Sequence, residues 1–159
     1  MNTPPTPSKP TRPALLGSTT EDVQAFKSLL TANSRLIGID AGTKTLGLAL
    51  SDVTRTIASP LETIRRTKFK DDAARLLHLA ATHGVSGFVL GLPANLDGNQ
   101  ISPLPILLWD ERLTTAAAER MLIEADASRK RRAEVIDKLA ATLILQGALD
   151  RMRLATSGS

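Results

Sequence analysis

Three carboxylates of this sequence stand where apolar patterns predict buried elements, although they are far apart along the chain. Asp40 and Glu111 each follow an apolar run, and Asp137 stands in the last predicted helix. An isolated carboxylate is costly to bury unless a cation pairs with it. The chain has no cysteine and two histidines, so a metal bound here would have oxygen ligands, which favours Mg²⁺ or Mn²⁺. Such a set is typical of two-ion hydrolysis of phosphodiester bonds.

The surroundings of Asp137 are the most informative of the three. In the last predicted helix an apolar arc recurs at the helical period, and Asp137 falls inside this arc. Alanines beside a core-facing aspartate would let the helix approach the sheet and still deliver a charge to it. The residues of the arc are Ile136, Leu139, Ala140, Leu143, Ile144 and Ala148.

Each carboxylate also has an ordinary structural explanation. Asp40 could form the turn that precedes Gly42. Glu111 could belong to a surface charge cluster or cap the next helix, and its neighbour Asp110 would point to the opposite face of a regular strand. The sequence leaves open which of these two neighbours faces the site. Asp137 could instead pair with one of three arginines, Arg129, Arg131 or Arg132.

Composition narrows the classes of function. The 159 residues carry a net charge of +4 with a sequence pI of about 9.9, which suits a polyanionic partner. Aromatic residues make up 3%, so a nucleic acid would be gripped by its backbone rather than by stacked bases. No apolar run reaches membrane-spanning length and no signal-peptide core is present, from which we expect a cytoplasmic protein without a membrane partner.

The chain is expected to form one α/β domain between two tails. Prolines predict a disordered tail over 1–17, a short helical extension follows over 18–33, and a flexible C-terminus covers 154–159. The main domain, 34–153, is predicted to contain a mixed sheet flanked by helices, with an antiparallel three-stranded meander followed by parallel strands. Strands are predicted at 35–41, 45–52, 56–59, 85–90 and 105–109, and helices at about 20–31, 70–81, 116–126 and 133–153.

Two of these boundaries depend on single residues. The first helix has capping-box spacing from Ser18, which would therefore begin it. The third strand of the meander is expected to end at Pro60, because proline cannot donate to a sheet ladder.

Several motifs occur in the order of a known family and span about residues 35–150. They are Gly38-Ile39-Asp40-Ala41-Gly42-Thr43-Lys44, Gly91-Leu92-Pro93 with Asn95, Asp110-Glu111-Arg112-Leu113-Thr114-Thr115, and Asp137 with Ala140 and Ala141. On these motifs the chain resembles the YqgF/RuvX family of RNase H-like nucleases, described as Holliday junction resolvases and pre-16S rRNA processing nucleases. The resemblance implies an RNase H-like fold with a central five-stranded mixed sheet. It also assigns the metal-binding catalytic triad to Asp40, Glu111 and Asp137.

The resemblance further implies what the site acts on. It indicates a metal-dependent hydrolase of phosphodiester bonds that processes the 5′ end of pre-16S rRNA, resolves Holliday junctions, or does both. Lys44, Asn95 and Arg112 would lie beside the site. The basic run that precedes Asp137 could clamp a phosphate backbone, and it consists of Arg129, Lys130, Arg131 and Arg132.

These substrate-binding candidates have alternatives too. Arg112 could form a salt bridge with Asp110 or Glu111, and Asn95 could be a simple turn residue. The run 129–132 could be a solvated charge run at the start of a helix. Cations at that position oppose the helix dipole, which favours a functional reason.

One connection is shorter than the family pattern. Five residues separate Gly98 from Leu104, where the family has a helix before the next strand. A parallel crossover usually needs a dozen or more residues. Either that helix is missing from the chain as given or this protein has lost it, and the grip on the substrate would be affected more than metal binding.

Two other functions fit parts of the sequence. Residues 40–43, Asp-Ala-Gly-Thr, resemble the phosphate loop of actin-like kinases and ATPases, but those enclose ATP between two such lobes and this chain has one. A non-catalytic module that binds nucleic acid or ribosomes would keep the fold without cleavage. Either a monomer or a homodimer fits the sequence, and the two cuts that branched DNA requires favour the dimer.

Overall fold

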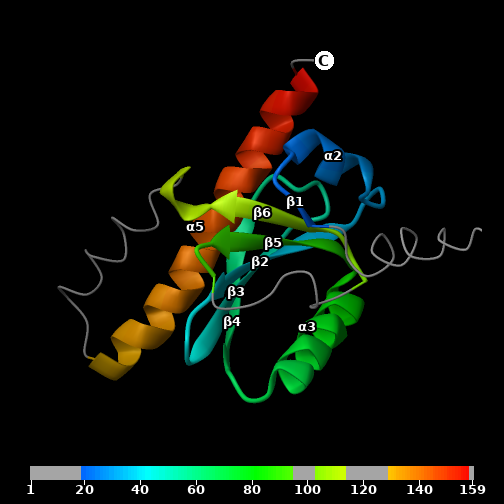
Figure 1. Cartoon of the computed structure of the whole chain (residues 1–159). Helices are drawn as coiled ribbons and strands as arrows, with labels where there is room; N and C mark the ends of the chain where they lie inside the picture. The colour runs from blue at the N-terminus through cyan, green and yellow to red at the C-terminus, as the bar shows by residue number, and fades with distance from the viewer. Residues whose placement is uncertain (1–18, 95–102, 114–128, 158–159) are drawn as a thin grey trace, which may run out of the picture.

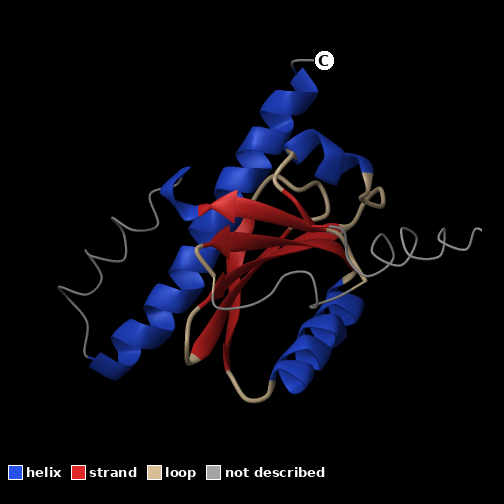
Figure 2. Ribbon diagram, in the orientation of Figure 1, coloured by secondary structure: helices blue, strands red, loops and turns tan. Residues whose placement is uncertain are grey.

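The computed structural model describes residues 19–94, 103–113 and 129–157, with the backbone alone for 129–137 and 155–157. Within this part of the chain, a central mixed sheet has helices on both faces (Figures 1 and 2). The strands follow the spatial order β1-β6-β5-β2-β3-β4. No helix of the described part is long and apolar enough to cross a membrane.

The antiparallel half of the sheet begins with the strand that carries Asp40. β2 (Arg35–Ala41) and β3 (Thr45–Ser51) form the predicted hairpin, in which Asp40 lies opposite Gly47. β4 (Ala58–Arg65) pairs with β3 and completes the meander as an edge strand.

The prediction that this third strand ends at Pro60 is wrong, because β4 continues to Arg65. Pro60 lies opposite Ala49, beside a register irregularity between Leu48 and Ala49. β4 is hydrogen-bonded to a neighbour on one side only, so a residue without an N–H group is tolerated in it. A proline therefore marks the strand as an edge and does not end it.

The parallel half of the sheet comes from the two continuous apolar runs. β5 (Val85–Leu92) lies parallel to β2, and β6 (Ile106–Asp110) lies parallel to β5. β1 (Thr19–Thr20) pairs with the outer side of β6, so the sheet has six strands rather than the predicted five. The predicted order, an antiparallel meander joined to parallel strands, is confirmed, and with it the RNase H-like fold.

The two long helices lie on opposite faces of the sheet (Figure 2). α3 (Phe69–His83) matches its prediction, and Gly84 ends it in the left-handed conformation with a φ of 66°. α5 (Arg129–Ser157) contains the helix predicted over 133–153 and extends it at both ends. The helix predicted over 116–126 lies outside the described residues.

α2 (Val23–Ser28) begins later than predicted, because residues 19 and 20 belong to β1. Asp22, rather than the predicted Ser18, caps the helix by accepting a hydrogen bond from the N–H of Gln24 at 2.9 Å. Phe26 is fully buried and belongs to the same hydrophobic cluster as α5. The segment expected as a separate extension therefore contributes to the sheet edge and to the core.

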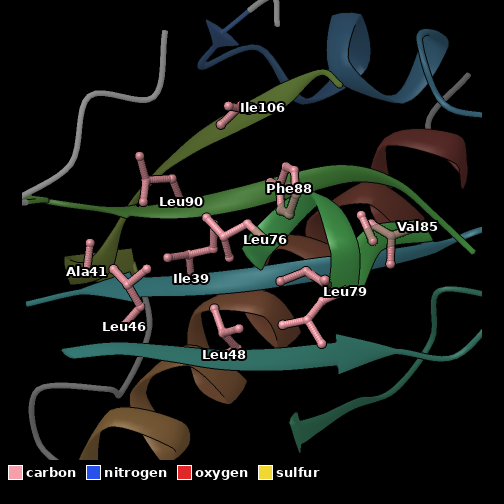
Figure 3. Packing of buried hydrophobic residues seen from close by; sticks show 12 residues of the cluster. Ile39, Ala41, Leu46, Leu48, Leu76, Leu79, Val85, Phe88, Leu90 and Ile106 are labelled. Atoms are coloured by element: carbon pink, nitrogen blue, oxygen red, sulfur yellow. The ribbon is translucent and has the colours of Figure 1, made fainter. Parts of the chain in front are cut away.

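Two hydrophobic clusters hold the layers together. Alternation along each strand sends successive side chains to opposite faces, so each face of the sheet meets one cluster. The cluster under α3 joins Leu76 and Leu79 to strand residues that include Ile39, Phe88 and Leu90 (Figure 3). The cluster under α5 joins Ala141, Ile144, Leu145, Ala148 and Leu149 to strand residues that include Leu36, Val89 and Leu107.

Candidate active site

Asp40 and Glu111 lie at the same end of the sheet. Asp40 is the last residue but one of β2, and Glu111 directly follows β6. β5 separates these two parallel strands, and Leu90 is level with a residue of each. Neighbouring strands are about 4.8 Å apart, so the strands that carry the two carboxylates are roughly 10 Å apart. The carboxyl ends of parallel strands are the usual place for a ligand site in such sheets.

The neighbours Asp110 and Glu111 differ in what surrounds them. Arg112 Nη2 lies 2.7 Å from Asp110 Oδ2, and the N–H of Arg112 donates to Asp110 Oδ1 at 2.9 Å. The side-chain hydrogen bond is the main reason why the pKa of Asp110 is lowered and the pKa of Arg112 is raised. Glu111 begins the 3-10 turn η2 (Glu111–Leu113), is half-buried, and has its Oε1 atom shielded from solvent. Asp110 thus holds Arg112, whereas the role of Glu111 as a metal ligand stays a prediction.

Glycines let α5 lie directly on the strand backbones beside this site. A Cβ atom on Gly38 of β2 would stand 2.7 Å from the Cβ of Leu145 and 3.0 Å from the carbonyl oxygen of Ala141. A Cβ atom on Gly91 of β5 would stand 2.4 Å from Cδ1 of Ile144. Real Cβ contacts are not this short, so a side chain at position 38 would push the helix outward, and one at position 91 would displace the side chain of Ile144.

α5 runs along the sheet so that its earlier residues lie toward Asp40. Gln146 accepts a hydrogen bond from the N–H of Ala58 and donates one to the carbonyl of Thr56, both at 2.9 Å. Ala58 pairs with Ser51, at the end of the sheet where β2 begins. The first half of α5 accordingly lies beside the carboxyl end of β5 (Figure 1).

The backbone of Asp137 lies in this first half of α5, one helical turn before Ala141, or about 6 Å along the axis. Ala140 and Ala141 are buried against the sheet, as the apolar arc predicts. The side chain of Asp137 lies outside the described part, so its contact with Asp40 and Glu111 stays a prediction. The described part also excludes Asn95 and the side chains of Arg129, Lys130, Arg131 and Arg132.

Lys44 is exposed in the turn that joins β2 to β3. Sequence reasoning missed the residue that fixes this turn. Arg66 donates from its backbone N–H to the carbonyl of Lys44 at 2.8 Å and from Nη1 to the carbonyl of Gly42 at 2.6 Å. Its Nε lies 3.7 Å from Oδ2 of the buried Asp72. An acidic residue in the first turn of a helix is usually a surface residue, so no local pattern marks Asp72 as buried.

The carboxylates at this end of the sheet have donor atoms that suit a hard cation. In the ranges that the structure covers, no three histidine, cysteine, aspartate or glutamate side chains form a group able to hold a metal. Asp40 and Glu111 offer carboxylate oxygens, which are the ligands that Mg²⁺ and Mn²⁺ prefer. The third predicted ligand, Asp137, would have to complete the site.

A cavity of about 440 Å³ lies at the opposite end of β2. Its lining includes the polar residues Arg35, Asp52 and His83 and the apolar residues Leu50 and Leu61. It contains none of the predicted site residues, so this hollow and the carboxylates occupy different ends of the sheet.

Relatives match most of the chain. A protein of Cereibacter sphaeroides (strain ATCC 17025), named "Putative pre-16S rRNA nuclease", is 55% identical over 148 residues that cover 83% of this chain and 92% of that protein. A relative of the same name from Beijerinckia indica is 56% identical over 143 residues, which cover 80% of this chain and 87% of that protein.

The same comparisons bear on the short connection after β5. The sequence profile of the RuvX family, described as Holliday junction resolvase, matches residues 34–103 and 99–151, two segments that meet in this connection. The alignment with the C. sphaeroides relative has 148 positions but uses 83% of these 159 residues, or about 132. About 16 positions of the relative therefore have no counterpart here, which agrees with the shortened crossover.

Two solved structures resemble this chain more distantly. RuvC of T. thermophilus in complex with a Holliday junction substrate is 17% identical, with a TM-score of 0.46 over 75% of this chain and 96% of that one. The yeast mitochondrial Holliday junction resolvase Ydc2 is 10% identical, with a TM-score of 0.48 over 84% of this chain and 85% of that one. The profile match and the relatives that are more than half identical decide the membership: this chain belongs to the RuvX family.

Proposed function

We propose that this protein is a divalent-metal-dependent endonuclease that hydrolyses phosphodiester bonds in structured nucleic acid. The observation that carries the proposal is that Asp40 and Glu111 lie at the same end of the sheet. Asp40 and Glu111 end strands that one strand separates, and α5 lies on the backbones beside them. Membership of the RuvX family supports the same activity.

The proposed roles follow from these positions. Asp40, Glu111 and Asp137 would hold Mg²⁺ or Mn²⁺, which would activate a water molecule and stabilise the leaving oxygen. Lys44, exposed in the turn after Asp40, would contact a substrate phosphate. The run Arg129, Lys130, Arg131 and Arg132 at the start of α5 would contact the backbone on another side. Arg112 binds Asp110 with a side chain that is 88% exposed, and it would contact a phosphate beside the site.

The 5′ end of pre-16S rRNA is the proposed substrate, and two relatives more than half identical to this chain support the choice of RNA, since both are named "Putative pre-16S rRNA nuclease". A four-way DNA junction is the second candidate, since the profile of the family is described as "Holliday junction resolvase". Both need the same chemistry at the metal centre. A junction needs two cuts and therefore two copies of the chain, whereas RNA processing needs one.

The direct test is cleavage by the purified full chain of a labelled pre-16S rRNA fragment and of a four-way DNA junction, with Mg²⁺ or Mn²⁺. We expect Asp40→Asn and Glu111→Gln to lower the cleavage rate by at least about 100-fold, because each removes a ligand charge. Asp110→Asn is the matched control and should keep the rate within a few fold. Loss of activity in Asp110→Asn but not in Glu111→Gln would reverse the assignment of these neighbours. A wild-type chain that binds but never cleaves would instead be a binding module.

Metal binding can be measured without a substrate. Trp109 is the one tryptophan of the chain and lies two residues before Glu111. Paramagnetic Mn²⁺ bound at this end of the sheet should quench its fluorescence in a saturable way. Quenching should weaken in Glu111→Gln and persist in Asp110→Asn, whereas equal quenching in both variants would argue against Glu111 as a ligand.

A further inference from the structure

Four exposed cations lie in the turn that follows Asp40 and in the segment that contacts this turn. Lys44 lies in this turn, and Arg65, Lys68 and Lys70 lie at the end of β4 and the start of α3. Among the residues that the structure describes, none of the four forms an ion pair or a side-chain hydrogen bond. Their charges are therefore available to an anionic partner.

Backbone contacts join the two segments that carry these cations. Thr45 pairs with Arg65 in the ladder between β3 and β4. Immediately beyond it, Arg66 binds the carbonyl of Lys44 at 2.8 Å and the carbonyl of Gly42 at 2.6 Å. The loop from β4 to α3 thus lies beside the end of the hairpin (Figure 1) and forms one unit with it.

The buried carboxylate of Asp72 holds the loop between β4 and α3 in place. Asp72, in the first turn of α3, is 2% exposed and lies 3.7 Å from Nε of Arg66. Its Oδ1 atom also accepts hydrogen bonds from the N–H of Thr67 at 3.1 Å and from the hydroxyl of Thr67 at 3.2 Å. These contacts fix the segment that carries the cations to both α3 and the hairpin turn, and therefore hold it near Asp40.

The charge balance of this stretch favours an anion. Asp72 is committed to Arg66, and Asp71 is the exposed carboxylate that remains between Arg65 and Asp72. Lys68 is the N-cap of α3 without a capping hydrogen bond, and Lys70 lies in the first turn. Cations at a helix N-terminus oppose its dipole and cost stability, so folding alone does not explain them.

We propose that Lys44, Arg65, Lys68 and Lys70 form a cationic edge that binds the phosphate backbone of the nucleic acid next to the acidic site. The inference rests on the proposed nuclease function and adds the path of the substrate, which passes from Asp40 toward the start of α3. Backbone rather than base recognition is favoured because the chain contains no tyrosine and one tryptophan.

The test compares two variants that each remove three positive charges from the full chain. The edge variant is Arg65→Gln/Lys68→Gln/Lys70→Gln. The control variant is Lys27→Gln/Arg151→Gln/Arg153→Gln, whose charges lie on α2 and the last third of α5. Affinity for the pre-16S rRNA fragment and for the four-way junction is measured with Ca²⁺ at several salt concentrations, and circular dichroism verifies that both variants are folded.

We expect the edge variant to bind at least about tenfold more weakly at 100 mM salt. The slope of its log affinity against log salt should be shallower by about 2 to 3, since three side chains are removed and each lost phosphate contact lowers the slope by roughly 0.7 to 0.9. The control variant should show less than half of that change in slope. Equal losses of affinity in both variants, or an unchanged affinity of the edge variant, would overturn the proposal of a cationic edge. Cleavage by the wild-type chain with Mg²⁺ is recorded in the same preparations, and its absence would overturn the nuclease proposal instead.

Discussion

The two faces of the sheet are packed in different ways. Under α3 the strands present large side chains, among them Ile39, Phe88 and Leu90, and the helix rests on that layer (Figure 3). Under α5, by contrast, Gly38 and Gly91 present no side chain, and residues of the helix occupy the space where a Cβ would stand. Both helices cover a hydrophobic layer, which under α5 includes Leu36, Val89 and Leu107, but α5 also lies against the strand backbone at the two glycines.

The difference follows the position of the predicted catalytic residues. α5 is the helix that carries Asp137, and an aspartate has a short side chain. A leucine or isoleucine in place of Gly38 would hold that carboxylate away from the strand ends that carry Asp40 and Glu111. We infer that the α5 face both buries apolar area and places a residue, whereas the α3 face serves to bury apolar area.

The largest effect is expected from Gly38→Val, which tests the close face directly. The new Cβ would stand 2.7 Å from the Cβ of Leu145 and 3.0 Å from the carbonyl oxygen of Ala141, and neither atom can rotate away. Overpacking of this kind costs about 3 kcal/mol in the free energy of unfolding, measured by urea denaturation. Activity per folded molecule should fall at least about tenfold, because α5 has to move and Asp137 moves with it.

Gly84→Ala is the control for that variant, because Gly84 ends α3 on the other face. Its φ is 66°, so alanine is strained there, but no atom lies within 4 Å of the added Cβ. The expected cost is about 1 kcal/mol, with unchanged activity per folded molecule. If both variants lost activity only in proportion to their loss of stability, the two faces would not differ in the way we infer.

A smaller effect is expected from Asp72→Asn, which tests the polar anchor of α3. Asparagine keeps an oxygen that can accept from Thr67 but removes the carboxylate that lies beside Arg66. The free energy of unfolding should fall by about 2 kcal/mol, as for the loss of a charged partner in a buried place. Asp71→Asn changes the exposed neighbour and should stay within about 0.5 kcal/mol of the wild type. Equal effects of the two variants would contradict the anchor.

Periodic features of this fold could be predicted from the sequence, and contacts between distant elements could not. The apolar run over 35–41 predicted both ends of β2 without error. The rule that ligand sites lie at the carboxyl ends of parallel strands predicted that Asp40 and Glu111 share one end of the sheet. β1 was missed because two threonines show no period. The contacts of Arg66 with the hairpin turn connect segments without any shared pattern, so no window of the sequence contains their signal.

The smallest effect is expected at the far end of the α5 face, where Asp52 holds the loop that Gln146 binds. Asp52 accepts hydrogen bonds from the hydroxyl of Thr54 and from the N–H groups of Thr56 at 2.8 Å and Ile57 at 3.0 Å. These bonds, that of Thr54 above all, lower the pKa of Asp52 from 3.8 to about 2. Because the pKa is lowered by folding, the stabilisation is complete above about pH 4 and is lost as the pH falls through 2.

Asp52→Asn should therefore cost less than about 1 kcal/mol at pH 7, since asparagine can still accept the two backbone hydrogen bonds without the charge. The measurement is urea denaturation of the wild type and the variant at pH 7, 4, 3 and 2. The difference between them should be constant from pH 7 to 4 and should shrink below it. A difference that stayed the same down to pH 2 would mean that the loop, and with it the contact of Gln146 with Thr56, does not depend on the charge of Asp52.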